Sequence, residues 1–205
     1  MAADVLAPAS VATITGLVLA GGRGQRMGGV DKGLQPFRGQ PLAAHAIARL
    51  APQVGEMLVS ANRNIDVYAS MAARVLVDAS DDFPGPLAGM LAGLRAARTP
   101  WLAVVPCDAP LLPPDLVARL ADAVNAAPGA MGAVVERDHG ATGRRIEPVC
   151  CLLATTLADE LERALADGQR KVEPWISAHA IAVPFDRASD AHAFANFNTL
   201  ADLRG

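Results

Sequence analysis

The chain has 205 residues, of which 52% are hydrophobic and 19% charged, and its formal net charge is −3 at pH 7. This length suits one domain with a substantial core, and the charge gives no indication of a nucleic-acid partner. The sequence lacks the apolar run of about 18 residues that is needed to cross a bilayer. Residues 1–12 lack the basic start of a signal peptide, so we expect a flexible tail there and a single domain over residues 13–205.

Three cysteines, Cys107, Cys150 and Cys151, lie in apolar surroundings, and two of them are adjacent. This pattern suits neither a disulfide framework nor a zinc site, whose ligands are normally spaced in pairs. The sequence therefore predicts buried, reduced thiols, and with them a cytoplasmic location.

Apolar runs of strand length alternate with helical stretches rich in alanine and leucine. The predicted strands are Ile14–Ala20, Met57–Ala61, Arg74–Val77, Trp101–Val105, Met131–Glu136, Val149–Leu153 and Ala180–Val183. The predicted helices are Pro41–Leu50, Asp66–Ala73, Leu87–Ala97, Pro114–Asn125, Thr156–Asp167 and Val172–Ser177. This alternation predicts a three-layer α/β/α fold with a mostly parallel, Rossmann-like sheet that is buried on both faces.

The pattern leaves two local features open: the residue that begins one helix and the role of one polar segment. Thr155 or Thr156 is placed to cap the helix that carries Leu157, Leu161 and Leu165 on one face. The polar segment Asp138–Arg145 either covers a site or only connects two strands, and the sequence does not choose between these roles.

A glycine-rich loop follows the first predicted strand. Five glycines, Gly21 and Gly22 among them, separate Ala20 from Lys32, and Arg23 and Arg26 add positive charge. Glycines allow backbone N–H groups to approach an anion closely. The loop matches neither the Walker A pattern nor Gly-x-Gly-x-x-Gly. Its backbone donors and three cations favour a polyphosphate site over a plain turn.

Polar residues also follow the next predicted strands: Asn62, Asp78 and Asp108. Ligands of open parallel sheets bind beyond the carboxyl ends of the strands, so these residues and the glycine loop are expected at one edge. Asp108 is suited to hold Mg²⁺, which often binds one or two carboxylates together with substrate phosphates. It could equally cap a helix or form a turn. Asn62 and Asp78 could contact a base edge or ribose hydroxyls, or act as turn residues.

Two further segments allow more than one interpretation. The glycine-proline entry into the helix after residue 85 could present free N–H groups to an anion or a base, or only allow close packing on the sheet. Asn196 and Asn198 share a face if their segment is extended, although Asn198 or Thr199 could instead cap a last helix. The four histidines show no ligand spacing, and no Ser-His-Asp or Cys-His arrangement stands out.

Together these motifs resemble the molybdenum cofactor guanylyltransferase family, within the nucleotidyltransferase group. The resemblance covers roughly residues 13–203 and is carried by the segments 19–32, 61–64, 85–89, 106–108 and 196–199. It implies a nucleotidyltransferase-type fold and a reaction in which GTP and molybdopterin give a guanine dinucleotide cofactor and pyrophosphate. The long segment Asp138–Arg145 departs from the family pattern, which leaves open how the pterin side is covered.

The resemblance also implies roles for individual residues. Lys32 and Arg26 would steady the phosphates, and Asp108 would hold Mg²⁺. The nucleotide would be bound by Leu19, Ala20, Gly21, Gly22, Lys32, Asn62, Asp78 and Asp108. The pterin would lie near Arg170, Lys171, Asn196 and Asn198. A molybdoenzyme or a delivery chaperone is a candidate partner, with neither nucleic acid nor a membrane involved.

Three other functions remain compatible with these residues. The chain could be a cytidylyltransferase that acts on the same pterin or a sugar-1-phosphate nucleotidyltransferase. It could also be a non-catalytic protein that binds and delivers a pterin or a nucleotide. The combination of Asp108 with Lys32 favours an enzyme, because a carrier needs neither a metal carboxylate nor a cation for a leaving group.

Overall fold

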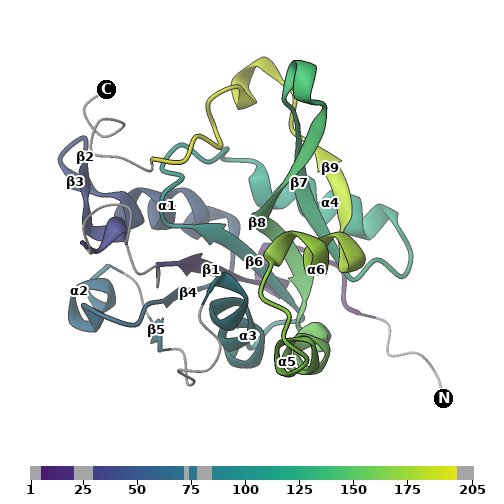
Figure 1. Ribbon diagram of the computed structural model, residues 1–205, viewed down its shortest axis with the longest axis horizontal. Helices are drawn as coiled ribbons and strands as arrows, with labels where there is room; N and C mark the ends of the chain where they lie inside the picture. Colours follow the sequence, from purple (N-terminus) through teal and green to yellow (C-terminus); the bar gives the residue numbers. More distant parts are fainter. Residues whose placement is uncertain (1–5, 21–29, 72–73, 78–84, 198–205) are drawn as a thin grey trace.

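A seven-stranded sheet forms the centre of the computed structural model, which describes residues 6–20, 30–71, 74–77 and 85–197 (Figure 1). Its strand order is β5-β4-β1-β6-β8-β7-β9. A separate two-stranded hairpin pairs β2 with β3. The strands span Ile14–Leu19 (β1), Pro36–Phe37 (β2), Gln40–Pro41 (β3), Glu56–Ser60 (β4), Arg74–Leu76 (β5), Trp101–Pro106 (β6), Gly132–Asp138 (β7), Arg144–Ala154 (β8) and Ile181–Pro184 (β9).

All strands of the large sheet except β8 run in the same direction. β1 pairs in parallel with β4 and β6, and β4 pairs in parallel with β5. β8 is antiparallel to both β6 and β7, while β7 and β9 are parallel to each other. The expected mostly parallel sheet is therefore confirmed, with one reversed strand inside it.

Helices cover both faces of the sheet. They span Leu42–Leu50 (α1), Ile65–Ala69 (α2), Pro86–Ala96 (α3), Leu116–Ala126 (α4), Ala158–Ala166 (α5) and Val172–His179 (α6). Short 3₁₀ turns span Val11–Thr13, Lys32–Leu34, Ala51–Gln53, Gly140–Thr142, Thr155–Leu157 and Ala188–Asp190.

Two apolar cores separate the three layers. The core on one face contains the buried side chains of α1 and α4, and the core on the other contains those of α3, α5 and α6. Alternate residues of β1 divide between the two cores, with Val18 in the first and Leu17 in the second. The strands are apolar almost throughout because both of their faces are buried.

The predicted strands and helices are all present, with ends shifted by a few residues. The β2–β3 hairpin was not predicted. Its two-residue turn has positive φ at both Arg38 (49°) and Gly39 (81°), which is the geometry of a tight hairpin turn. Since each strand has only two residues, the apolar pattern is too short to reveal them.

The predicted threonine cap of α5 is wrong. The helix begins at Ala158 after a 3₁₀ turn, and Leu157 stands at the cap position without a side-chain hydrogen bond. The hydroxyl of Thr155 instead donates to the carbonyl oxygen of Pro100, 3.1 Å away. The threonine therefore ties the end of β8 to the start of β6.

The segment Asp138–Arg145 forms the tip of a β hairpin. β7 continues to Asp138, a 3₁₀ turn spans Gly140–Thr142, and β8 begins at Arg144. Figure 1 shows this hairpin projecting beyond the rest of the sheet. The segment therefore connects two strands, which is one of the two roles that the sequence left open.

Glycines on α3 allow this helix to lie close to the sheet. A Cβ atom on Gly93 would lie 2.5 Å from Leu17 Cδ2, and one on Gly89 would lie 2.8 Å from both Leu19 Cδ2 and Ser60 Oγ. Close helix–sheet packing, one of the two interpretations of this segment, is therefore observed.

Residues 6–12 belong to the segment that was expected to form a tail, yet they contact the domain. The backbone N–H of Ala9 donates to Asn125 Oδ1, and Asn125 Nδ2 donates back to the Ala9 carbonyl, both at 2.9 Å. Trp101 Nε1 donates to the carbonyl oxygen of Ala7 at 2.8 Å. Packing against the domain thus begins before residue 13. Among the described residues, no helix has the length and apolar character that a membrane span requires.

Candidate active site

The carboxyl ends of β5, β4, β1 and β6 lie side by side at one edge of the sheet, called the carboxyl edge below. The hydrogen-bond ladder continues one residue past the strands: Ala20 N donates to Ser60 O at 2.8 Å, and Cys107 N donates to Leu19 O at 3.1 Å. Likewise Ala61 N donates to Leu76 O at 2.9 Å. The segments that lead to Lys32, Asn62 and Asp108 therefore leave the sheet next to one another.

Lys32 and Asp108 meet at this edge, although 76 residues separate them in the sequence. The Nζ atom of Lys32 donates to Asp108 Oδ2 in an ion pair. Their side chains are 20% and 17% exposed, so the pair is partly screened from water but remains open to a ligand. The structure thus brings together the cation and the carboxylate that sequence reasoning placed in one site.

The C-terminal segment reaches the same place. The backbone N–H of Phe197 donates to the carbonyl oxygen of Asp108 at 3.0 Å. The Phe197 ring lies 4.7 Å from that of Phe37, measured between centroids. Asn196, which is exposed, therefore lies next to Asp108 in the fold.

The structure also places three other predicted nucleotide-binding residues. Leu19 is half-buried under α3, Ala20 is buried, and Asn62 is exposed just beyond the end of β4. The remaining predicted site residues lie outside the described part of the chain: Gly21, Gly22, Arg26, Asp78 and Asn198.

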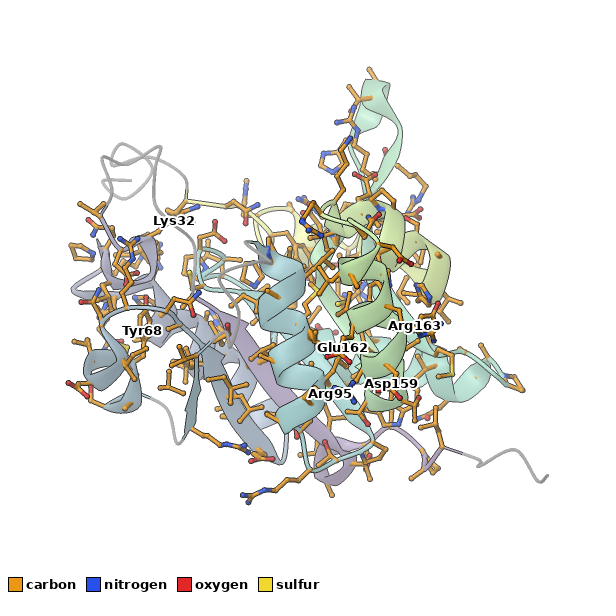
Figure 2. The ribbon with its side chains drawn as sticks, turned by 60° about the horizontal axis from the view of Figure 1, so that its bottom comes forward. Lys32, Tyr68, Arg95, Asp159, Glu162 and Arg163 are labelled. Atoms are coloured by element: carbon orange, nitrogen blue, oxygen red, sulfur yellow. The ribbon has the colours of Figure 1, made fainter. Side chains whose placement is uncertain are left out.

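Arg170 and Lys171 lie in the connection between α5 and α6. Arg95, near the end of α3, is paired with Asp159 and Glu162 of α5 (Figure 2). α3 follows the parallel strand β5 and α5 follows the reversed strand β8, so the two helices run in opposite directions. Because α3 begins at the carboxyl edge, α5 runs back toward that edge. The chain direction therefore agrees with a place for Arg170 and Lys171 on this side, where Arg170 Nη1 also donates to the Leu165 carbonyl at 2.8 Å.

Sequence reasoning missed a buried polar cluster beneath Lys32. Asp31 is 9% exposed and accepts hydrogen bonds from Tyr68 Oη at 2.6 Å, Asn64 Nδ2 at 2.9 Å and Gly33 N at 3.2 Å. The position of Asp31 directly before Lys32 was visible in the sequence. The participation of Tyr68, a residue inside a predicted helix, had no sequence signal.

The three cysteines are buried and free, as predicted. Burial raises the pKa of Cys107 to about 12, with the neighbouring Asp108 carboxylate adding to the effect, and burial likewise raises the pKa values of Cys150 and Cys151. Thiols that stay protonated are poor nucleophiles. The thiol of Cys107 therefore packs beside the site without taking part as a thiolate.

A mostly parallel α/β sheet flanked by helices is also the fold of solved nucleotidyltransferase structures. The family model described as a MobA-like NTP transferase domain matches residues 16–183. The chain belongs to this MobA-like NTP transferase family.

Relatives of known name extend the match to almost the whole chain. A molybdenum cofactor guanylyltransferase of Acidovorax sp. (strain JS42) is 55% identical over 196 residues, which cover 93% of each chain. A protein of the same name from Ralstonia nicotianae is 53% identical, covering 93% of this chain and 94% of its own.

Solved structures show the same fold at lower identity. The molybdopterin-guanine dinucleotide biosynthesis protein A of Archaeoglobus fulgidus superposes with a TM-score of 0.70 at 22% identity, covering 93% of this chain and 95% of its own. A nucleotidyl transferase from Methanothermobacter gives a TM-score of 0.68 at 22% identity, covering 93% of this chain and 94% of its own.

Proposed function

We propose that this chain transfers GMP from GTP to molybdopterin-bound molybdenum cofactor, releasing pyrophosphate and forming a guanine dinucleotide cofactor. Family membership and relatives more than half identical that carry the name of this activity support the proposal. The structural observation that carries it is the ion pair between Lys32 and Asp108 at the carboxyl edge.

The triphosphate would bind at this edge. Lys32 and Arg26 would contact the phosphates, and the backbone of Leu19, Ala20, Gly21 and Gly22 would line the nucleotide. Asn62 and Asp78 would hold the guanosine portion. Transfer between two anions depends mainly on positioning and on stabilising the charge that gathers on the leaving group. A cation held at the strand ends meets both needs.

Asp108 would hold Mg²⁺, which would supply positive charge to offset the negative charge of the phosphates. The side chains present fit this ion. Mg²⁺ prefers hard oxygen ligands and commonly binds one or two carboxylates, with phosphates and water completing its shell. The described residues contain no group of three or more histidine, cysteine or acidic side chains, so a closed protein cage is absent there.

The acceptor would lie on the β8 side of Asp108. Arg170, Lys171, Asn196 and Asn198 are the residues that we assign to the pterin. Its phosphate oxygen would attack the α-phosphorus of GTP, and pyrophosphate would leave. A phosphate nucleophile is already ionised near pH 7, so the reaction needs no general base. This agrees with cysteines that remain protonated beside the site.

The proposed location is the cytoplasm, where thiols stay reduced. The three buried, unpaired cysteines support it. Molybdoenzymes and delivery chaperones are the proposed protein partners, since a finished cofactor must be handed to an apoenzyme.

Pyrophosphate release and ligand binding are measured with GTP, CTP, ATP and UTP, each with molybdopterin, with a sugar 1-phosphate or with no acceptor, and each with and without Mg²⁺. We expect release with GTP only when both molybdopterin and Mg²⁺ are present. Release with CTP would instead establish a cytidylyltransferase, and release with a sugar 1-phosphate as acceptor would establish a sugar nucleotidyltransferase. Tight nucleotide or pterin binding without any release would establish a carrier.

A further inference from the structure

Asp31 is a buried carboxylate with an unusual set of partners. Its Oδ1 accepts from Tyr68 Oη and from the backbone N–H of Gly33, and its Oδ2 accepts from Asn64 Nδ2. Burying an ionised carboxylate is costly unless hydrogen bonds replace its water shell. Each of these three donors is a neutral group. The carboxylate is therefore satisfied without drawing the adjacent ammonium group of Lys32 toward itself.

Tyr68 is suited to act as a permanent donor. Its side chain is fully buried, and burial followed by the hydrogen bond to Asp31 raises the pKa of its hydroxyl well above the usual value. The hydroxyl thus keeps its proton at neutral pH and remains a hydrogen-bond donor. Figure 2 shows Tyr68 on the same side of the molecule as Lys32.

The cluster joins three loops of the carboxyl edge. Asp31 and Gly33 come from the loop after β1, while Asn64 and Tyr68 come from the segment after β4. A Cβ atom on Gly33 would lie 2.4 Å from Tyr68 Oη and 3.4 Å from the Sγ atom of Cys107, which directly follows β6. The backbone beside Lys32 is therefore packed against the residue before Asp108.

The start of α2 is shaped to reach this cluster. Asn64 has φ of 53° and ψ of 35°, a left-handed conformation that asparagine tolerates better than most residues. This conformation precedes the helix that carries Tyr68, and both side chains contact the same carboxylate. The unusual backbone conformation of Asn64 thus allows both side chains to hold Asp31.

We propose that Asp31 is a positioning residue: through Tyr68, Asn64 and Gly33 it fixes the backbone of Lys32, so that the ammonium group stays at Asp108 and at the nucleotide phosphates. This inference rests on the proposed function. Asp31 contacts neither substrate nor metal in this role, and it acts through the position of Lys32 alone.

A double-mutant cycle between Asp31 and Lys32 tests the proposal. The variants are Asp31→Asn, Lys32→Ala and the combination of both, and the measured quantity is the dissociation constant for GTP by calorimetry. We expect Asp31→Asn to weaken binding about tenfold and Lys32→Ala to weaken it between about tenfold and about 100-fold. If Asp31 acts through Lys32, the double variant binds GTP no more weakly than Lys32→Ala alone.

Two further variants guard against a merely structural effect. Tyr68→Phe removes one donor and keeps the ring, so it should weaken GTP binding less than Asp31→Asn but in the same way. Asp66→Asn, at an exposed position of the same helix, is the matched control and should change nothing. Far-ultraviolet circular dichroism of each variant verifies that it is folded before binding is measured.

The proposal would be overturned if the loss of GTP affinity in the double variant were the product of the two single losses. A folded Asp31→Asn protein with unaltered affinity for GTP would also overturn it. Pyrophosphate release by the unaltered chain tests the proposed function separately. If another nucleotide binds more tightly than GTP, the cycle is run with that nucleotide, so the inference stands or falls without guanylyl transfer. A chain that binds none of the four nucleotides would overturn both.

Discussion

Asp31 and Asp190 are the two buried aspartates in the described part of the chain, and they are held in opposite ways. Asp190 pairs with the guanidinium of Arg119, with Nη1–oxygen distances of 3.0 and 3.2 Å. That guanidinium also lies 3.5 Å above the Phe185 ring and donates to the Pro184 carbonyl. Among the described residues, the donors to Asp31 are all neutral groups.

The difference shows that the partners of a buried carboxylate determine what it contributes to the protein. The Arg119–Asp190 pair cancels both charges internally and joins α4 to the segment after β9, so its effect is confined to stability. Among the described residues Asp31 pairs with no cation, and the ammonium group of Lys32 instead pairs with Asp108 at the carboxyl edge. Burial of a carboxylate can thus stabilise a fold at one place and prepare a site at another.

The largest effect is expected from Asp190→Ala. Removing one partner of a buried ion pair leaves the other charge uncompensated, and such changes destabilise a protein by about 3–5 kcal/mol. Urea denaturation measures this loss, with Asp122→Ala at an exposed position of α4 as the control. GTP affinity of the folded fraction should be unaltered. A weakened affinity would break the distinction between the two aspartates.

Asp108→Asn should remove activity and leave the fold intact. The amide keeps the shape of the side chain but lacks the negative charge with which Asp108 would hold Mg²⁺, so kcat should fall at least about 100-fold. Steady-state pyrophosphate release over a Mg²⁺ titration measures the change, and thermal unfolding serves as the control. Near-normal turnover in this variant would remove Asp108 from the mechanism.

Lys32→Ala should lose a charge-assisted contact of about 1.5–3 kcal/mol, which corresponds to roughly one to two powers of ten in rate or affinity. Pyrophosphate release with GTP measures it. Arg98→Ala is the comparison, because Arg98 is exposed and precedes β6, at the opposite end of the strand from Asp108. Equal rates of pyrophosphate release in Lys32→Ala and Arg98→Ala would contradict the proposed role of Lys32 at the phosphates.

The smallest effect is expected from Arg144→Ala on the β7–β8 hairpin. Arg144 contacts Glu136 and Asp186 at the surface, where salt screens ion pairs. Its hydrogen bond is the main cause of the lowered pKa of Asp186. A lowered pKa means that the contribution is present at neutral pH and is lost as the pH falls through it. Chemical denaturation should show a slight loss at low salt near pH 7, and none in acid.

The strands were predictable because a strand that is buried on both faces consists of a long apolar run, and the helices alternate with these runs. The run Val149–Leu153 marked the buried part of β8, but the strand begins at Arg144, where polar residues pair beyond the core. The reversed direction of β8 had no signal, since an apolar run reads the same in either sense. Thr155 was misjudged because its hydroxyl found a carbonyl on a distant strand.

The site was predictable where one rule of topology applies. Parallel strands place their carboxyl ends at one edge, so Lys32 and Asp108 were expected together, and they are in contact. The cluster around Asp31 was not predictable in the same way. It depends on Tyr68 turning inward from a five-residue helix, a matter of three-dimensional packing that periodicity does not encode.

The order of the strands has a consequence for how the protein behaves in a crowded solution. In the described part of the chain, the two outermost strands, β5 and β9, have three and four residues, and β9 ends at Pro184, whose nitrogen carries no hydrogen. Short borders of this kind offer little template for a strand of another molecule. The described edges of the sheet are thus poor sites for edge-to-edge pairing with a strand of another molecule.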